Sequence, residues 1–560
     1  MALAVGAIVL IPRVIIRLRL SAAKHPSVRG HARMSRRIAR LVPDFRYSSD
    51  AFFQTDDAPE EIAQQRCAAL ERLQAGASER SAHVLRASRE LESQVSDVAF
   101  TARYRVPFPY RDGLPAALRY GSLAQETRGN QICDLDGQWR YDLSGSYGLN
   151  VFGYGFYKQC LAAGFERAKD LGPVLGPYHP DIQYNVAALR RISGLDEVSF
   201  HMSGTEAVMQ AVRLARYHTR RSHLVRLCGS YHGWWDGVQP GVGNSRKVND
   251  VYTLADLSDK TLAVLATRKD IACVLINPMQ AMHPNRDAPG DSTLLSSRRS
   301  TDFERERYTE WLKKIRDICT RRGIVLIFDE VFTGFRLGLR GAQEYFGVQA
   351  DMVTYGKTLG GGLPIGVLCG RHALMARFRP EQPANVCFAR GTFNAHPYVM
   401  SSMRTFLAYA QSDEAGQCYA AADALWQARV STLNEQLAEQ RLPIKLANMH
   451  SVITVLYTQP SRYNWMFQFY LREAGLELGW TGTGRLIMSL AYSDEEFAEI
   501  GRRLIAAATR MNQDGWWWPG AHLSNRWIVR RFALDVLRSK FALRAMRPPQ
   551  QVAQVNGDLS

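Results

Sequence analysis

Charged side chains stand at the ends of two apolar runs near the middle of the chain. Leu326–Phe328 runs into Asp329 and Glu330, and Met352–Tyr355 runs towards Lys357. If these runs are strands of an open α/β sheet, their ends lie where such sheets bind ligands. The pattern therefore predicts carboxylates and an amine side by side at one edge of a sheet. Each alone would fit a solvated turn or a surface charge, and only the combination argues for chemistry.

The carboxylate and the amine match what pyridoxal phosphate requires of a protein. This cofactor needs an amine that bonds to its aldehyde and a carboxylate that keeps its ring nitrogen protonated. Lys357 is followed by Gly360-Gly361-Gly362, and glycines let backbone and ligand approach closely enough to desolvate and activate the amine. We expect Lys357 to carry the cofactor and to shuttle protons, and Asp329 to pair with the ring nitrogen.

Two further segments are suited to hold the rest of that cofactor. Ser203-Gly204-Thr205 opens a predicted helix, whose first N–H groups and positive dipole end attract a phosphate. Tyr231 follows the apolar run Leu224–Leu227, so its ring is placed to cover one face of the pyridine ring. An ordinary helix cap is the alternative interpretation of the first segment, and His232 is equally well explained by a structural role.

The elements that must position these residues follow from the alternation of short apolar runs and amphipathic segments after residue 196. Runs such as Leu224–Leu227 and Ala272–Ile276 predict a mostly parallel sheet flanked by helices. After Pro397 the pattern changes to a long helix, mixed strands and a final helix, which predicts a second, smaller α/β unit. The polar stretch Met282–Asp302 is expected to be a surface insertion.

Composition and turn signals divide the chain into five predicted parts. We expect an N-terminal extension that is basic and then helical (1–100), followed by the first part of a small domain with its connection (101–195). A large cofactor-binding domain (196–396), the second part of the small domain (397–515) and a basic aromatic extension (516–560) complete the chain. Asp136-Gly137, between two short strand-like arms, predicts a hairpin in the small domain.

With these motifs in order, residues 105–512 resemble the class III aminotransferases, which are pyridoxal-phosphate enzymes of fold type I. Within that class the chain is similar to the glutamate-1-semialdehyde aminomutases and to transaminase modules of polyketide and lipopeptide assembly lines. The resemblance implies an α/β fold with a large domain built on a mostly parallel sheet and a smaller α/β domain. The helical termini are additions in this chain.

The resemblance also assigns roles to single residues. It makes Lys357 the lysine that binds the cofactor, Asp329 the partner of its ring nitrogen, and Tyr231 the residue that stacks on its ring. The family is homodimeric, so we expect a homodimer here, and no metal. The implied phosphate contacts are Ser203, Gly204, Thr205 and, across the dimer interface, Thr392.

The chain departs from the family near the cofactor. Asn277-Pro278-Met279 stands where relatives usually read Glu-Pro-Val, and Phe332 stands where many carry a glutamine. Gly148–Gly153, together with Pro278 and Gln280, is more similar to the assembly-line modules than to the mutases. These departures bear on the choice of substrate and leave the core machinery in place.

We therefore expect a transaminase that moves an amino group from a donor amino acid to a ketone or aldehyde, on an acyl chain or a carrier-bound intermediate. Two alternatives stay open. One is a glutamate-1-semialdehyde-type 2,1-aminomutase with the same residues, and the other is a catalytically inactive docking protein. The retention of both Lys357 and Asp329 argues against the inactive protein.

The formal charge of +17 is concentrated at the two ends of the sequence. Residues 1–47 carry +9 and residues 516–560 carry +5, which leaves about +3 for the body. No nucleic-acid-binding module accompanies this charge. The basic ends are expected to contact the protein's own body, an acyl carrier protein or an anionic membrane surface. Ala2–Ile11 is too short to cross a bilayer as a helix, and nine scattered cysteines favour a cytoplasmic protein, at most peripheral to the membrane.

Overall fold

The short apolar runs form a seven-stranded sheet at the centre of the large domain, in the order β4-β10-β9-β8-β7-β5-β6. Neighbouring strands from β6 to β9 run parallel, as the alternation with helices predicts, whereas β10 is antiparallel to both β4 and β9. The strands are β4 Glu197–His201, β5 His223–Leu227, β6 Val251–Leu254, β7 Ile271–Ile276, β8 Val325–Asp329, β9 Met352–Gly356 and β10 Gly366–Gly370.

This computed structural model describes residues 2–25, 31–119, 123–246, 248–278, 304–479 and 485–545, with side chains from residue 11 to residue 539 within those ranges. The expected insertion at Met282–Asp302 lies outside the described residues, as do Met279 and Gln280.

Helices cover both faces of the sheet, because its central strands are apolar on both sides. On one face, Val212 of α10 belongs to a buried cluster with Leu224 and Ile327 of the sheet. On the other face, Ile315 of α12 belongs to a cluster with Leu326, because successive side chains of a strand point to opposite faces. The strand ends between the two layers are thus held rigidly. The helices of this domain are α10 Gly204–Thr219, α11 Asp259–Thr267, α12 Arg305–Arg322, α13 Gly341–Tyr345 and α14 His372–Met375.

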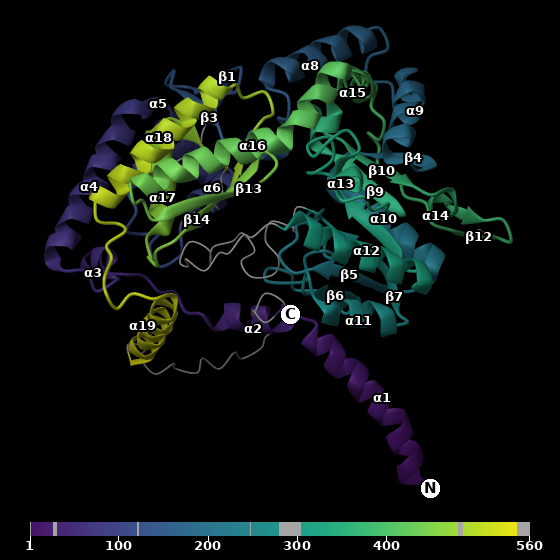
Figure 1. Cartoon of the computed structure of the whole chain (residues 1–560), viewed down its shortest axis with the longest axis horizontal. Coiled ribbons are helices and arrows are strands. Elements are labelled where there is room, and N and C mark those ends of the chain that lie inside the picture. Colours follow the sequence, from purple (N-terminus) through teal and green to yellow (C-terminus); the bar gives the residue numbers. More distant parts are fainter. Residues whose placement is uncertain are drawn as a thin grey trace, which may run out of the picture.

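The small domain combines chain segments from both sides of the large domain (Figure 1). The expected hairpin is present as β2 and β3, and Gly137 has φ +73° at its turn. It joins β1 and β15 in a four-stranded sheet, while β13, β14 and β16 form another. Strands β11 and β12 pair with each other in a separate hairpin. The strands are β1 Ala124–Arg128, β2 Gln131–Asp134, β3 Trp139–Asp142, β11 Phe378–Arg379, β12 Gln382–Val386, β13 Ile444–Met449, β14 Val452–Tyr457, β15 Leu476–Glu477 and β16 Arg485–Ile487.

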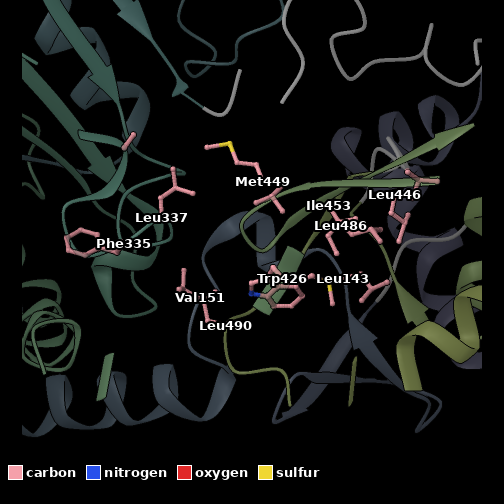
Figure 2. Close-up of a cluster of buried hydrophobic side chains, with 14 of the residues drawn as sticks. Leu143, Val151, Phe335, Leu337, Trp426, Leu446, Met449, Ile453, Leu486 and Leu490 are labelled. Carbon is pink, nitrogen blue, oxygen red and sulfur yellow. The ribbon is translucent and has the colours of Figure 1, made fainter. Parts of the chain in front are cut away.

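One hydrophobic core joins these sheets to their helices. Figure 2 shows Trp426 of α16 beside Leu143 and Leu486, which are far apart in the sequence. Burying such side chains fixes β16 against the segment that precedes α8. The helices of this region are α7 Gly145–Gly148, α8 Tyr154–Ala168, α9 Asp181–Ser193, α15 Pro397–Ala410, α16 Asp413–Glu439, α17 Phe467–Glu473 and α18 Asp494–Gln513.

Much of the two terminal extensions packs on the small domain. Trp516 and Trp517 are 0% and 2% exposed. Arg66 is fully buried and donates hydrogen bonds to the carbonyl oxygens of Gly515, at 2.8 Å, and Phe53, at 2.7 Å. The extensions therefore contact the protein's own body, including the carboxyl end of α1 at Leu20 and one side of α2 at Arg36, whereas the outer sides of α1, α2 and α19 are exposed. The helices are α1 Ala2–Ala22, α2 Ala32–Leu41, α3 Ser49–Gln54, α4 Glu60–Arg80, α5 Ala82–Gln94, α6 Ser96–Tyr104 and α19 Asn525–Ala545.

Candidate active site

A cavity of ≈ 470 Å³ lies at the carboxyl ends of β8 and β9 and beside the start of α10. Six of the residues predicted for the site line it: Ser203, Gly204, Thr205, Tyr231, Asp329 and Lys357. The remainder of the wall is formed by Leu149, Met202, Val208, His232, Gly233, Asn277, Val331, Phe332, Gly362, Leu363, Pro364, Ile365 and Arg485. The four segments that contain the predicted residues thus meet in one place, together with three others at Leu149, Asn277 and Arg485.

Glycines allow these segments to touch. A Cβ atom at Gly233, which has φ +87°, would lie 2.3 Å from Thr205 Oγ1, and one at Gly204 would lie 2.7 Å from Val331 Cγ1. Both distances are shorter than any real carbon contact, so a larger residue at either position would push the segments apart. The loop after β5, the start of α10 and the end of β8 are therefore in direct contact around the cavity.

Both carboxylate oxygens of Asp329 are held by the protein. Oδ2 accepts a hydrogen bond from His232 Nδ1 at 2.6 Å, and Oδ1 accepts from the Val331 N–H at 3.2 Å and the Thr354 hydroxyl at 3.3 Å. Burial lowers the pKa of His232, although the carboxylate opposes that shift. A neutral imidazole therefore donates its Nδ1 proton and orients Asp329 towards the cavity.

Lys357 sits in an unusual backbone conformation next to this carboxylate. Its φ is +48°, in the left-handed region that side-chain-bearing residues seldom adopt, and such strain costs about 1–3 kcal/mol where a site enforces it. Burial lowers the pKa of Lys357 to about 8, while Asp329 raises it and Arg336 lowers it further. Lys357 Nζ lies 5.2 Å from the centroid of the Phe332 ring. The amine is thus able to lose its proton near neutral pH.

The start of α10 presents an anion site to the same cavity. Ser203 Oγ accepts the Glu206 N–H at 3.3 Å, and Glu206 Oε2 accepts the Met202 N–H at 2.9 Å. The N–H groups of Gly204 and Thr205 come before the first hydrogen bonds of the helix, so they can bind an anion. Ser203 is therefore the helix cap, and its neighbours carry the donors.

Glu330, the second carboxylate after β8, does not line the cavity. Its carboxylate turns away and accepts the N–H groups of Ala342, at 2.7 Å, and Gln343, at 3.3 Å, at the start of α13. Burial raises the pKa of Glu330 to about 8. Side chains alternate along a strand, so consecutive residues cannot point to the same side. Asp329 alone serves the cavity.

The two remaining predicted residues lie nearer the surface. Tyr231 is 61% exposed on the cavity wall, so one face of its ring is open to a ligand. Thr392 is exposed and does not line the cavity as the described part of the chain forms it. Its neighbour Gly391 lies near the start of α10, because a Cβ there would be 3.7 Å from Glu206 Oε2.

Two contributors to the cavity had no functional role in the sequence analysis. For His232 a structural role stays open in the sequence, although its place directly after Tyr231 at a strand end is a usable signal. Arg485 begins β16 in the small domain and reaches the cavity from there. Nothing in its local sequence marks it, since only the packing of the two domains brings it to Lys357.

These residues fit pyridoxal phosphate. His232 binds Asp329 through a hydrogen bond, and its imidazole is kept neutral, so it does not neutralise the charge of this buried carboxylate. A cationic N–H in the cavity would do so. The ring nitrogen of the cofactor supplies such a group. Lys357 would hold the aldehyde carbon, and the N–H groups of Gly204 and Thr205 would hold the phosphate.

The lowered pKa of Lys357 predicts how cofactor capture depends on pH. Only the unprotonated amine attacks an aldehyde, so the capture rate by the cofactor-free protein should rise through a midpoint near pH 8. Stopped-flow absorbance measures this rate, and Nα-acetyl-lysine amide treated in parallel gives the unburied reference, with a midpoint above about 10. If the capture rates of the protein and of the reference amine had the same pH midpoint, the amine of Lys357 would not be buried.

Comparisons with known proteins identify the family of the chain. Residues 117–255 and 306–508 match the family model for aminotransferase class-III. Over 342 residues the chain is 30% identical to a glutamate-1-semialdehyde 2,1-aminomutase of Hydrogenobaculum sp. (strain Y04AAS1), covering 58% of this chain and 74% of that protein. The corresponding protein of Alkaliphilus oremlandii (strain OhILAs) is 33% identical over 297 residues, which cover 50% of this chain and 64% of that protein.

A solved structure extends the likeness to three dimensions. A transaminase with pyridoxal phosphate bound superposes with a TM-score of 0.59 and 26% identity, over 75% of this chain and 98% of that one. Family, fold and cavity agree on the same cofactor. The chain belongs to the class-III aminotransferase family and is a pyridoxal-phosphate-dependent transaminase of fold type I.

Proposed function

We propose that the protein transfers the amino group of an α-amino acid to a ketone or aldehyde on an apolar acyl chain. The wall of the cavity carries this proposal. Among the described residues that line it, Lys357 and Arg485 are the charged cations, and most of the others are apolar. A cavity of this kind suits one carboxylate and one hydrocarbon chain.

Arg485 is the candidate for binding the donor carboxylate. It enters the cavity from β16, and the core around Trp426 and Leu486 holds that strand in place. A guanidinium group binds a carboxylate through two parallel hydrogen bonds, which fix orientation as well as position. A donor bound there would present its amino group towards Lys357.

The apolar residues of the wall support an acyl acceptor. The apolar lining consists of Leu149, Met202, Val208, Val331, Phe332, Leu363, Pro364 and Ile365. Burying each methylene of a chain against such residues contributes about 0.8 kcal/mol. Phe332 also replaces the glutamine of many relatives, which removes a polar group from this wall.

The residues of the chain divide the chemistry between them. Bound pyridoxal phosphate supplies an electrophilic carbon and an electron-withdrawing ring. Asp329 holds the proton on the ring nitrogen. Once the donor amine has displaced it from the cofactor, Lys357 Nζ would take the proton from the Cα of the donor and deliver it to the carbon on the other side of the amino nitrogen, and it would reverse that transfer for the acceptor. The pKa of about 8 suits both directions near neutral pH.

A homodimer would complete the phosphate site. Thr392 is exposed, and the adjacent Phe393 is 50% exposed, as is typical of residues that become buried on assembly. In the dimer, Thr392 of the partner subunit would contact the phosphate beside Gly204. Sedimentation with and without the cofactor would measure whether the dimer forms and whether the phosphate strengthens it.

Changing Arg485 to alanine tests how the donor binds. For an α-amino acid donor, kcat/KM should fall by about 10- to 100-fold, which corresponds to one charge-assisted hydrogen-bond pair. A primary amine donor without a carboxylate should be affected less than about threefold, because it makes no bond to the guanidinium. Arg485→Lys should recover part of the loss. Equal losses for both donors would mean that Arg485 acts on the fold and not on the carboxylate.

A second candidate function is the intramolecular aminomutase reaction. The names of the two curated relatives favour it, since both are glutamate-1-semialdehyde 2,1-aminomutases. The same Lys357 and Asp329 would serve both reactions. Incubation with glutamate 1-semialdehyde alone separates them: isomerisation without net release of a keto acid would favour the mutase, and the absence of product would favour the transaminase.

A further inference from the structure

Helix α1 stands away from the body of the protein (Figure 1). It is attached at its carboxyl end, where Ala23 is fully buried and its carbonyl oxygen accepts the Ala255 N–H at 2.8 Å. Leu20 packs against the core. The other side of the helix carries apolar residues spaced three and four apart, with exposures of 56%, 53%, 42% and 63% for Ile11, Val14, Ile15 and Leu18.

The length of the apolar part of α1 matches one leaflet of a bilayer. Every residue from Ala2 to Ile11 is apolar or glycine, and Arg13, Arg17 and Arg19 follow after Pro12. Ten helical residues extend about 15 Å, which is half of a hydrocarbon core about 30 Å thick. No helix in the described part of the chain is long and apolar enough to span a membrane.

Helix α2 adds an anion-binding groove beside α1. Four arginines on one stripe of the helix line a cavity of ≈ 420 Å³ together with Ser245 and Asn249, namely Arg33, Arg36, Arg37 and Arg40. None of the described residues that line it is acidic. The nearby carboxylates of Asp250 and Asp236 are paired with Arg216, at 2.7 Å, and Arg246, at 3.8 Å. The groove therefore lacks a counterion from the described chain.

The same helix exposes apolar residues next to its arginines. Met34, Ile38 and Leu41 are 49%, 40% and 63% exposed and share the adjacent stripe of α2. A second cavity of ≈ 420 Å³ is lined by residues from both helices, including Leu20 and Lys24 of the first segment and Arg33 and Met34 of the second. The two helices thus form one continuous surface that combines cations with exposed hydrocarbon.

We propose that α1 and α2 bind the surface of an anionic membrane. Residues 2–11 and the exposed face of α1 enter one leaflet, and Arg13, Arg17 and Arg19 lie at the level of the headgroups. The arginine groove of α2 takes a lipid phosphate, which Arg33 and Arg37 bind as a charged pair of donors. An apolar anchor and a basic patch are the two signals that stable membrane attachment requires.

Vesicle sedimentation of the full chain tests this proposal. The protein should bind vesicles that contain phosphatidylserine or phosphatidylglycerol and should bind pure phosphatidylcholine at least about tenfold more weakly. Salt at about 1 M should weaken binding to the anionic vesicles, because it shortens the screening length to about 3 Å. Equal binding to neutral and anionic vesicles, or no binding to either, would overturn the proposal.

Matched variants locate the surface. Replacing Arg33, Arg36, Arg37 and Arg40 by glutamine should weaken binding to anionic vesicles more than about tenfold, since each cation contributes about fivefold near such a surface. The control removes the same charge from exposed positions elsewhere, at Arg86, Arg89, Arg103 and Arg213. An equal loss in the control would mean that net charge alone drives binding.

A second pair of variants tests the apolar face. Replacing Ile11, Val14, Ile15 and Leu18 by serine should reduce binding to anionic vesicles about as much as replacing the four arginines of α2. Replacing Val529, Leu534 and Leu537 of α19 by serine should not reduce it, although these residues are 67%, 48% and 50% exposed. Transaminase turnover measured without vesicles should stay unchanged in every variant, which shows that the fold is intact. If the α1 variant instead changes the oligomeric state and keeps its vesicle binding, this face contacts a second copy of the chain.

Discussion

Replacing Lys357 with alanine is expected to lower kcat by at least about three orders of magnitude. The variant loses both the amine that carries the cofactor and the group that moves the proton at the donor Cα. The fold should persist, because alanine tolerates the left-handed backbone at this position, where φ is +48°, no worse than lysine does. Steady-state kinetics give the loss, and unfolding by urea gives the stability.

Two controls separate chemistry from charge. Lys357→Arg keeps a cation in the cavity but no nucleophilic amine, so it should be as inactive as the alanine variant. Lys445 is exposed on β13, and Lys445→Ala should leave kcat unchanged. Borohydride reduction followed by peptide mass analysis should place the cofactor on Lys357 in the native protein. Label on another lysine, or more than a tenth of the turnover in Lys357→Ala, would refute the assignment.

Replacing Asp329 with asparagine should lower kcat by about two to four orders of magnitude. The amide still accepts the proton of His232 but is neutral, so it cannot hold the ring nitrogen of the cofactor in its protonated form. The substitution also removes the charge that raises the pKa of Lys357, so the midpoint of cofactor capture should fall below about 8. Stopped-flow capture and steady-state kinetics measure the two effects separately.

Glu330→Gln is the matched control for that variant. Glu330 is the next residue, is 1% exposed and carries a carboxyl group whose pKa burial raises to about 8, so at neutral pH it is largely uncharged already. Its side chain caps α13 and does not line the cavity. We expect turnover within about threefold of the native protein. Similar losses in the two variants would mean that Asp329 supports the fold and not the cofactor.

The sequence was sufficient for the parts of the site that depend on local structure. Asp329 ends a short apolar strand, Lys357 directly follows another, and Ser203 caps a helix, so their elements could be predicted from neighbouring residues. Parallel strands then bring such ends to one edge of the sheet. The place of Tyr231 after an apolar run made it a candidate for stacking on the ring, and the resemblance to the family implies the same role.

Contacts between distant segments could not be predicted in this way. The bond between His232 and Asp329 joins residues 97 apart in sequence, and Arg485 reaches the cavity only because the small domain packs on the large one. The roles of the two adjacent carboxylates differ because side chains alternate along β8, which turns Glu330 away from the cavity. The antiparallel course of β10 depends on the turn after Lys357, and an apolar run does not reveal its direction.

The basic ends show the same limit. Composition indicated cations and large apolar residues at both termini, but it did not separate docking onto the body from contact with a membrane. The structure buries Trp516 and Trp517 and leaves the face of α1 around Leu18 exposed. Docking onto the body therefore accounts for Trp516 and Trp517, and the proposed membrane contact concerns α1 and α2.

Following a labelled amino group through the purified protein tests the account most directly. The protein is loaded with pyridoxal phosphate and given an α-amino acid labelled with ¹⁵N, together with a long-chain keto acceptor. We predict that the yellow colour of the lysine-bound cofactor bleaches on addition of the donor, that one keto acid is released per site, and that the label appears in the acceptor. A protein that takes up no cofactor, or that releases no keto acid and labels no acceptor, would contradict the assignment of this chain as a transaminase.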